Sequence, residues 1–293
     1  MSTVYLLGNG FDINLGLKSH YQDFADSSFW PFGQDTNRRM GVFLNEKKSE
    51  VDTWFDLEAL LGQYAVMASS RPMSSEVIDE DKCSFKLLVD SFNDYIKLQQ
   101  NTVQPENDSI AACLVRHFAS DTTEPRIFTF NYTDLNFMCR NITKRNRFEC
   151  HHVHGTCNDN TIIMGFGDEL QGVIPTYNFM RKSFNQHYNP PRIIEEILKA
   201  HTVVMFGLSM GNVDYSYFDF FFKRISIPEQ FVSSSMKRVI IFAYKDSSRM
   251  AILNNLYEKT EGHLGNLNAL NDFRMVTLGV EPEKDVIDVI NSI

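Results

Sequence analysis

The alternation of short apolar runs with helical segments constrains the fold of this chain more than any other feature. Six runs have the apolar pattern of strands and are bounded by turn residues: Val4–Leu7, Ile127–Phe130, Thr161–Met164, Thr202–Phe206, Val239–Ala243 and Met275–Leu278. Helical spacing occurs at Asp134–Arg145, Pro191–Lys199, Asp214–Arg224, Ser247–Glu258 and Pro282–Ile293. Strands that alternate with helices in this way form a mostly parallel sheet, so we predict a Rossmann-like α/β fold.

The first apolar run breaks this rhythm, because the next one follows only after a long interval. Within the interval, helical spacing occurs at Trp54–Met67, Val77–Leu98 and Ile110–Phe118, and polar linkers are expected at Gln34–Glu50, Ser69–Ser75 and Gln100–Ser109. We therefore predict a Rossmann-like domain made of residues 1–27 and 123–293, interrupted by a helical insertion over residues 28–122.

Composition and charge narrow the class of protein. Hydrophobic residues make up 43% of the chain and charged residues 22%, which is typical of a globular protein with a buried core. A net charge of −9 repels phosphodiester backbones and disfavours nucleic acid as a partner. The five cysteines form no C-x-x-C pair, no basic leader precedes the first strand, and no run approaches about 18 apolar residues. We expect a cytoplasmic protein without disulfides or a membrane segment.

A glycine-rich turn, Gly8-Asn9-Gly10-Phe11-Asp12, comes directly after the first strand. Glycines at a strand end allow a tight turn and a close approach to a ligand, and the amides of the following helix would bind an anion such as pyrophosphate. The dinucleotide fingerprint G-x-G-x-x-G would place a glycine at position 13, where this chain has Ile13. The alternative interpretation is a strand-to-helix turn without a ligand.

A second polar motif, FTFNYTD, leads from the strand near Phe128 into a helix. Ligands of parallel sheets gather at the carboxyl ends of the strands, so we expect Asn131 to face the same crevice as the glycine turn. The alternative is that Thr133 or Asp134 simply caps the helix.

A histidine motif, His151-His152-Val153-His154-Gly155, lies between Cys150 and Cys157. Structural zinc prefers spaced pairs of ligands, and neighbouring histidines on a strand point to opposite faces, so no metal site is expected. His154 precedes a glycine that leaves room for substrate, which suits a general base at a strand end. A histidine with a purely structural role is the alternative.

The segment Gly207-Leu208-Ser209-Met210-Gly211 matches G-x-S-x-G between a strand and a helix, as in serine hydrolases. Asp246 and His263 follow in the hydrolase order, but His263 precedes the last predicted strand, whereas a hydrolase histidine should follow it. A serine hydrolase with Ser209 as the nucleophile therefore stays as an alternative.

Taken in order, LLGNGFDINLGLKSHYQDF, TFNYTDL, HVHG with the downstream GFGD, and FGLSMGNVDYSYF resemble the AbiH family of bacterial abortive-infection proteins. The resemblance covers nearly the whole chain outside the insertion. That family is similar in turn to sirtuin-like NAD-binding domains. The resemblance implies an anti-phage protein that binds NAD and hydrolyses its nicotinamide–ribose bond, with a homo-oligomer or a phage-derived trigger left open. A nucleotide sensor without catalysis is a further alternative.

The resemblance also implies residue roles. Asn131 would hold the nicotinamide ribose or the attacking water, and His154 would be the base. Contacts to the dinucleotide are expected from Gly8, Asn9, Gly10, Asp12, Thr129, Gly155, Gly207, Ser209 and Asp214, with Glu58 as a further acidic candidate. Thr133 stands where the sirtuin pattern has aspartate, and the zinc-ribbon cysteines are missing. The loss of that aspartate argues against protein deacylation more than against hydrolysis of NAD.

Overall fold

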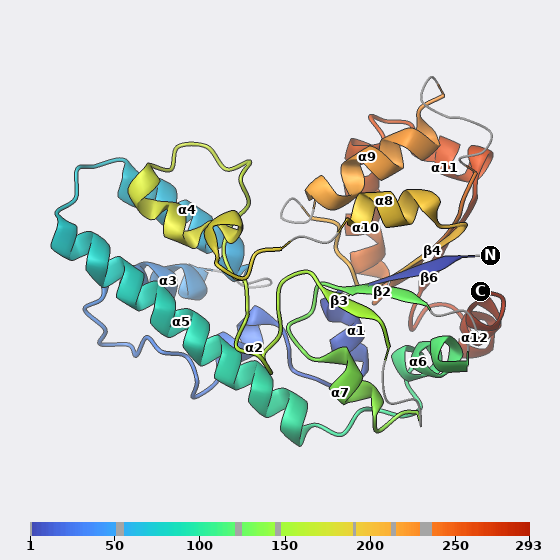
Figure 1. Cartoon of the computed structure of the whole chain (residues 1–293), viewed down its shortest axis with the longest axis horizontal. Coiled ribbons are helices and arrows are strands. Elements are labelled where there is room, and N and C mark those ends of the chain that lie inside the picture. Colours follow the sequence, from blue (N-terminus) through green and yellow to red (C-terminus); the bar gives the residue numbers. More distant parts are fainter. Residues whose placement is uncertain are drawn as a thin grey trace. The chain divides into compact units, whose positions relative to one another are not determined.

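The computed structural model describes residues 2–50, 56–120, 125–143, 148–189, 192–211, 215–228 and 236–293. The chain forms two compact units (Figure 1). The first unit consists of Met1–Leu17, Val103–Val153 and Pro190–Ile293, and the second consists of Lys18–Thr102 and His154–Asn189. The second unit thus contains most of the predicted insertion together with a later segment, which the predicted domain bounds assign to the Rossmann-like domain.

A six-stranded sheet forms the centre of the first unit, in the order β3-β2-β1-β4-β5-β6. Its strands are β1 (Thr3–Leu7), β2 (Arg126–Thr129), β3 (Cys150–His152), β4 (Thr202–Phe206), β5 (Arg238–Ala243) and β6 (Asp272–Thr277). Every neighbouring pair is parallel. This arrangement confirms the predicted α/β fold with a parallel sheet.

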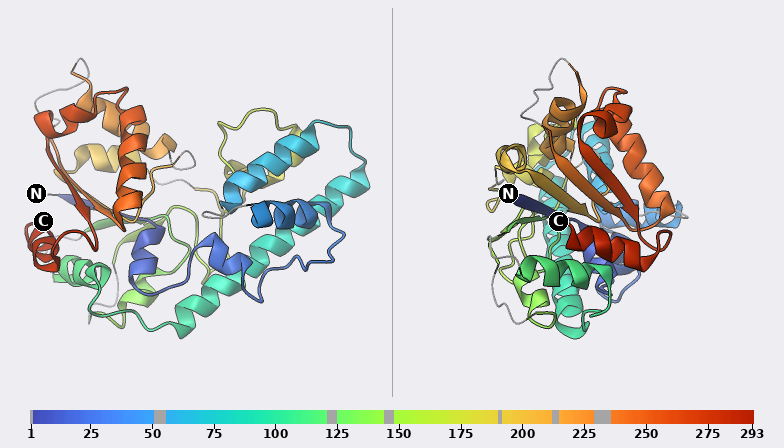
Figure 2. Two further views of the ribbon diagram at one scale, coloured as in Figure 1. Left: turned by 180° about the vertical axis from the view of Figure 1, so that it is seen from behind. Right: turned by 90° about the vertical axis from the view of Figure 1, so that its right-hand side faces the viewer.

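Helices cover both faces of this sheet (Figure 2). Tyr5 and Leu7 of β1 pack with one set of helices: α1 (Asn9–Asn14), α6 (Ile110–Ser120), α7 (Leu135–Cys139) and α12 (Glu283–Asn291). Val4 and Leu6 pack with the other set: α8 (Ile193–Lys199), α9 (Tyr215–Ser226), α10 (Asp246–Lys259) and α11 (Leu264–Leu270). Because successive side chains of a strand point to opposite faces, one buried strand contributes to two cores.

The second unit is helical. It contains α2 (Tyr21–Ala25), α3 (Arg39–Glu50), α4 (Leu57–Ser69), α5 (Ser75–Thr102) and the short 3-10 helices η1 (Pro175–Met180) and η2 (Lys182–Phe184). The predicted helical stretch after the first strand is therefore confirmed. In the ranges that the structure describes, no helix combines the length and apolar character needed to cross a bilayer.

Two local predictions for this unit are wrong. Thr161–Met164 does not form a strand. Three consecutive residues of this segment, Ile162, Ile163 and Met164, are all buried. The run is apolar because it enters the core of the helical unit, where no neighbouring strand is described. Gln34–Glu50 is mostly not a linker, because α3 (Arg39–Glu50) occupies all of it except the first five residues. Met40 and Leu44, four residues apart, lie on the buried face of α3.

Candidate functional site

The turn after β1 packs directly against the loop after β4. The Gly8 amide donates to the Phe206 carbonyl at 2.9 Å, and the Gly10 amide donates to the Gly207 carbonyl at 3.0 Å. A Cβ atom on Gly10 would lie 2.6 Å from the Gly207 Cα atom, a distance that real side chains do not reach. Gly207 itself has a φ of +68°, in the left-handed region that favours glycine.

This packing accounts for the glycines without a ligand. The amides of Gly8 and Gly10 are occupied by the main-chain carbonyls of Phe206, the last residue of β4, and of Gly207, the first residue after it. The Gly8 and Gly10 amides therefore do not fit a phosphate-binding role in this arrangement. Asn9, between them, is partly exposed. The alternative interpretation of a tight turn describes the local geometry of the two glycines.

A buried polar cluster lies beside this turn, at the carboxyl ends of β1 and β2. Asp12 of α1 accepts a hydrogen bond from Asn131 Nδ2 at Oδ1 and another from Thr133 Oγ1 at Oδ2, both at 2.7 Å. The exposed fractions are 3% for Asp12, 5% for Asn131 and 3% for Thr133. Asn131 and the glycine turn thus meet at one edge of the sheet, as their positions at strand ends predict.

The negative charge of the Asp12 carboxylate is not balanced by a nearby positive charge in the described residues. No basic side chain in the described part of the chain pairs with it. Burial raises the pKa of Asp12 from 3.8 to about 7, although the hydrogen bonds from Thr133 and Asn131 act in the opposite direction. A carboxyl with this pKa gains and loses its proton near neutral pH, which suits general acid–base chemistry.

The loop after β2 positions this cluster. Thr129 Oγ1 accepts a hydrogen bond from the Asn131 amide at 3.1 Å, and Asp134 caps α7 through the Phe137 amide. Asn131 Oδ1 is buried and has no hydrogen-bond partner in the described residues. A buried acceptor without a partner costs free energy and is rare in folded proteins.

Thr133 is the member of the cluster that sequence reasoning did not include in the site. Its partner is the Asp12 carboxylate, whereas the capping role falls to Asp134. The signal was present in the sequence, because Thr133 lies two residues after Asn131 in the same polar loop.

The loop after β4 does not support a serine hydrolase. Ser209 is exposed, and its Oγ accepts only a long hydrogen bond from the Gly211 amide at 3.4 Å. The residues with positive φ in this loop are Gly207 and Met210, whereas a hydrolase nucleophile itself sits on the strained turn. Within the described ranges, no histidine bonds to Ser209. Asp214 lies outside the described residues.

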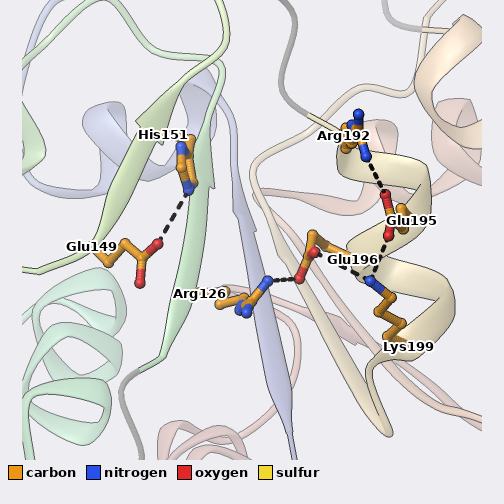
Figure 3. A network of polar contacts seen from close by, with 7 residues as sticks. All are labelled: Arg126, Glu149, His151, Arg192, Glu195, Glu196 and Lys199. Carbon is orange, nitrogen blue, oxygen red and sulfur yellow. Dashed lines mark hydrogen bonds and ion pairs between the residues drawn. The ribbon is translucent and has the colours of Figure 1, made fainter.

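The histidine motif is divided between the two units. His151 lies on β3 in the first unit, where its ring is 3.6 Å from Glu149 (Figure 3). The other ion pairs in that view include Arg126 of β2 with Glu196 of α8, which join strand to helix at the amino ends of the strands. The side chain of His151 is exposed.

His154 and Gly155 belong to the second unit. His154 is 4% exposed, and its carbonyl accepts a hydrogen bond from the Ile163 amide at 2.9 Å. Gly155 has a φ of +73°, and a Cβ atom there would lie 2.0 Å from the Thr161 carbonyl oxygen. This glycine is therefore required by the loop that follows His154.

The second unit also contains a buried ion pair that includes Glu58. Its carboxylate bonds to Lys182 Nζ at 3.0 Å and accepts from the Gly165 amide at 3.3 Å. Lys182 was not predicted, because nothing in the sequence distinguishes it from a surface lysine. The pair joins α4 to the GFGD segment and η2.

Among the residues that the structure describes, no three His, Cys, Asp or Glu side chains lie close enough together to hold a metal ion. Cys150 is partly exposed in the first unit and Cys157 is buried in the second, and neither forms a disulfide in the described residues. Burial raises the pKa of the Cys150 thiol above its ordinary range.

Comparison with known families matches residues 4–234 to the family described as bacteriophage abortive infection AbiH. Searches of curated protein sequences and of solved structures found no match. The family match covers most of the chain and includes the Asp12, Asn131 and Thr133 cluster as well as His154. The protein therefore belongs to the AbiH family of bacteriophage abortive-infection proteins.

Proposed function

We propose that the first unit binds a dinucleotide of the NAD class at the carboxyl ends of β1 and β2, and that it hydrolyses the nicotinamide–ribose bond during abortive infection. The observation that carries this proposal is the buried Asp12 carboxyl, held by Asn131 and Thr133 and lacking a basic partner in the described part of the chain. The resemblance of the AbiH motifs to sirtuin-like NAD-binding domains, drawn from the sequence, suggests the same assignment.

The strand order supports a dinucleotide as the ligand. An open parallel sheet of order 3-2-1-4-5-6 binds dinucleotides outside the carboxyl ends of its strands, near the point where the order reverses. Here β1 and β4 meet at that point, but Gly10 and Gly207 fill it by direct packing. We therefore place the reacting ribose at the β1–β2 side, beside the Asp12 and Asn131 pair.

The proposed reaction needs little more than a held ribose and one base. The bond between the nicotinamide nitrogen and ribose C1′ breaks, and the nitrogen keeps the electron pair. A water oxygen forms the new bond to C1′ and gives its proton to the Asp12 carboxylate, which releases it to solvent. A base with a pKa near the working pH is the most effective one, and the raised pKa of Asp12 meets this condition.

His154 is the other candidate base. Its burial in the second unit agrees with a structural role as well as with a catalytic one, so the two bases need to be compared in the same assay. The geometry of the first unit favours Asp12, because Asp12 contacts Asn131 directly.

The test is nicotinamide release from NAD by the full chain, with binding measured separately by calorimetry. We expect Asp12→Asn and Asn131→Ala to lower turnover by about 10²–10⁴-fold, the usual effect of removing a general base or its partner, while NAD still binds. Asp288→Asn removes the same charge from an exposed position on α12 and should leave turnover unchanged. His154→Ala tests the other base.

Three outcomes would contradict parts of this proposal. Wild-type turnover in a folded Asp12→Asn protein would exclude Asp12 as the base. Binding of NAD without nicotinamide release by the wild-type protein would favour nucleotide sensing over hydrolysis. Covalent labelling of Ser209 by a fluorophosphonate would favour the serine hydrolase.

A further inference from the structure

The two oxygens of the Asp12 carboxyl have partners of different chemical kinds. Oδ1 accepts from the Nδ2 atom of Asn131, and Oδ2 accepts from the hydroxyl group of Thr133, both at 2.7 Å. An amide nitrogen can only donate a hydrogen bond, whereas a hydroxyl group can either donate or accept one. The two oxygens are therefore not equivalent when Asp12 takes up a proton.

This difference places the proton of the neutral acid on Oδ2. A proton on Oδ1 would point at the hydrogen atoms of the Asn131 amide, which offers no acceptor on that side. A proton on Oδ2 can be donated to Thr133 Oγ1 once the hydroxyl group has turned its own hydrogen away. The hydrogen bond between Thr133 and Asp12 thus persists in both protonation states, with the direction of donation reversed.

Burial and the surrounding loop make Thr133 hard to replace in this role. Asp12 and Thr133 are each 3% exposed, so solvent does not readily take the place of a lost partner. The backbone on both sides of Thr133 is held by side chains of the same loop. Thr129 Oγ1 accepts from the Asn131 amide, and Asp134 caps the start of α7. The loop therefore fixes where the hydroxyl group lies.

The helices around Asp12 supply neutral or solvent-exposed groups. In α7, burial and the charges of Asp134 and Asp12 raise the pKa of the Cys139 thiol above its ordinary range, so the thiol stays neutral. The titratable groups of α6, which packs against α1, are exposed or partly exposed: Cys113, Arg116 and His117. Burial and the two neutral hydrogen-bond partners are therefore the influences on the protonation of Asp12.

We propose that Thr133 is the positioning residue of the Asp12 base: its hydroxyl group donates to Oδ2 of the ionised carboxylate and accepts the proton that Oδ2 carries after water has been deprotonated. This role rests on the proposed hydrolysis of NAD. Without a hydroxyl group at position 133, the ionised form loses a charge-assisted hydrogen bond, which is stronger than the neutral bond that the acid loses. Asp12 would then hold its proton more tightly and act as a base only at higher pH.

Carbon-13 NMR of the full chain, labelled at the aspartate carboxyl carbon, follows the Asp12 proton directly, and Asp12→Asn identifies its signal. Thr133→Val replaces the hydroxyl group by a methyl group and should raise the pH midpoint of that signal by about one pH unit. Thr133→Ser restores a hydroxyl group and should return the midpoint toward the wild-type value. Thr260→Val is the matched control. It makes the same exchange at a buried threonine that bonds to the Leu256 carbonyl, and it should not move the midpoint.

Nicotinamide release at pH 6 and pH 9 separates positioning from a purely structural role. In Thr133→Val, turnover should fall about 10-fold at pH 6, where the ionised form of Asp12 becomes scarcer, and much less at pH 9. A structural defect would lower turnover by the same factor at both pH values. Thr133→Ala also lacks the hydroxyl group and has a smaller side chain, so it keeps both measurements decisive where Thr133→Val disturbs folding.

The outcomes separate this role of Thr133 from NAD hydrolysis itself. An unchanged Asp12 midpoint in a folded Thr133→Val or Thr133→Ala protein would overturn the role of Thr133, as would an equal rise in Thr260→Val. Equal losses of turnover at pH 6 and pH 9 would reject it too, while leaving hydrolysis in place. No nicotinamide release by the wild type would overturn hydrolysis instead, and the NMR titration would still decide whether Thr133 governs the proton on Asp12.

Discussion

Two buried aspartates, one in each unit, have similar hydrogen bonds and different charge environments. Asp12 in the first unit accepts from Asn131 and Thr133. Asp81 in the second unit is 1% exposed and accepts from the hydroxyl groups of Tyr64 and Tyr177, at 2.5 and 2.7 Å. In addition, the guanidinium group of Arg39 lies 3.9 Å from Asp81, whereas Asp12 has no such partner in the described residues.

The difference distinguishes a carboxylate that ties three helices together beside a cation from a carboxylate that has no charged partner in the described residues. Burial and the hydrogen bond to Asp81 raise the pKa values of Tyr64 and Tyr177 above their ordinary range, so both hydroxyls remain donors at neutral pH. With Arg39 nearby, they hold Asp81 in place and join α4, α5 and η1. The two groups that donate hydrogen bonds to Asp12 are neutral. The cost of burying a charged carboxylate is therefore reduced when Asp12 takes up a proton.

Removing Asp81 should produce the largest loss of stability. Asp81→Leu leaves two tyrosine hydroxyls and a guanidinium group without their acceptor, which should lower the free energy of unfolding by about 3–5 kcal/mol. Urea denaturation followed by circular dichroism measures this change. Asp79→Leu, on an exposed part of the same helix, should change stability by less than about 0.5 kcal/mol. Similar losses of stability in Asp81→Leu and Asp79→Leu would contradict the structural role of Asp81.

The second largest expected effect is a pH dependence of the free energy of unfolding that comes from Asp12. The pKa of Asp12 is about 7 in the folded protein and near 3.8 when the side chain is solvated. Between these values the folded state binds more protons than the unfolded state, so stability falls as pH rises from about 4 to 7, by up to about 4 kcal/mol. Asp12→Asn cannot ionise and should lack this decline. Urea denaturation at pH 5 and pH 8 compares the two proteins, and equal declines would contradict the raised pKa.

A smaller effect should separate packing from ligand binding in the glycine turn. Gly10→Ala places a Cβ atom 2.6 Å from the Gly207 Cα atom and should cost about 1–3 kcal/mol through overpacking. Gly265→Ala, in α11 with nothing within 4 Å of the new Cβ, is the matched control and should not destabilise the protein. If Gly10→Ala is as stable as this control but does not bind NAD, the result would indicate that the glycine turn contacts the ligand.

Much of the sheet could be predicted, because strand periodicity is a local property. The run Thr202–Phe206 is β4 with the same bounds, and Val4–Leu7 lies within β1. Helix α11 was not among the predicted elements, since seven residues carry little periodic pattern. The strand assumed for the histidine motif is the three-residue edge strand β3, which ends at His152, before His154. Thr161–Met164 shows the opposite error, because an apolar run indicates burial and becomes a strand only where another strand supplies hydrogen bonds.

For the candidate site, the sequence by itself determined that the GNGFD turn and the FNYT loop lie at one edge of a parallel sheet, because both follow strands. Tertiary structure decided what each residue does there. Gly10 contacts Gly207 although nearly two hundred residues separate them in the sequence, and Asp12 takes its two hydrogen bonds from the loop after β2. It also divided the histidine motif, placing His154 in the second unit. Such contacts depend on how the strands are ordered in space, which local spacing in a sequence does not encode.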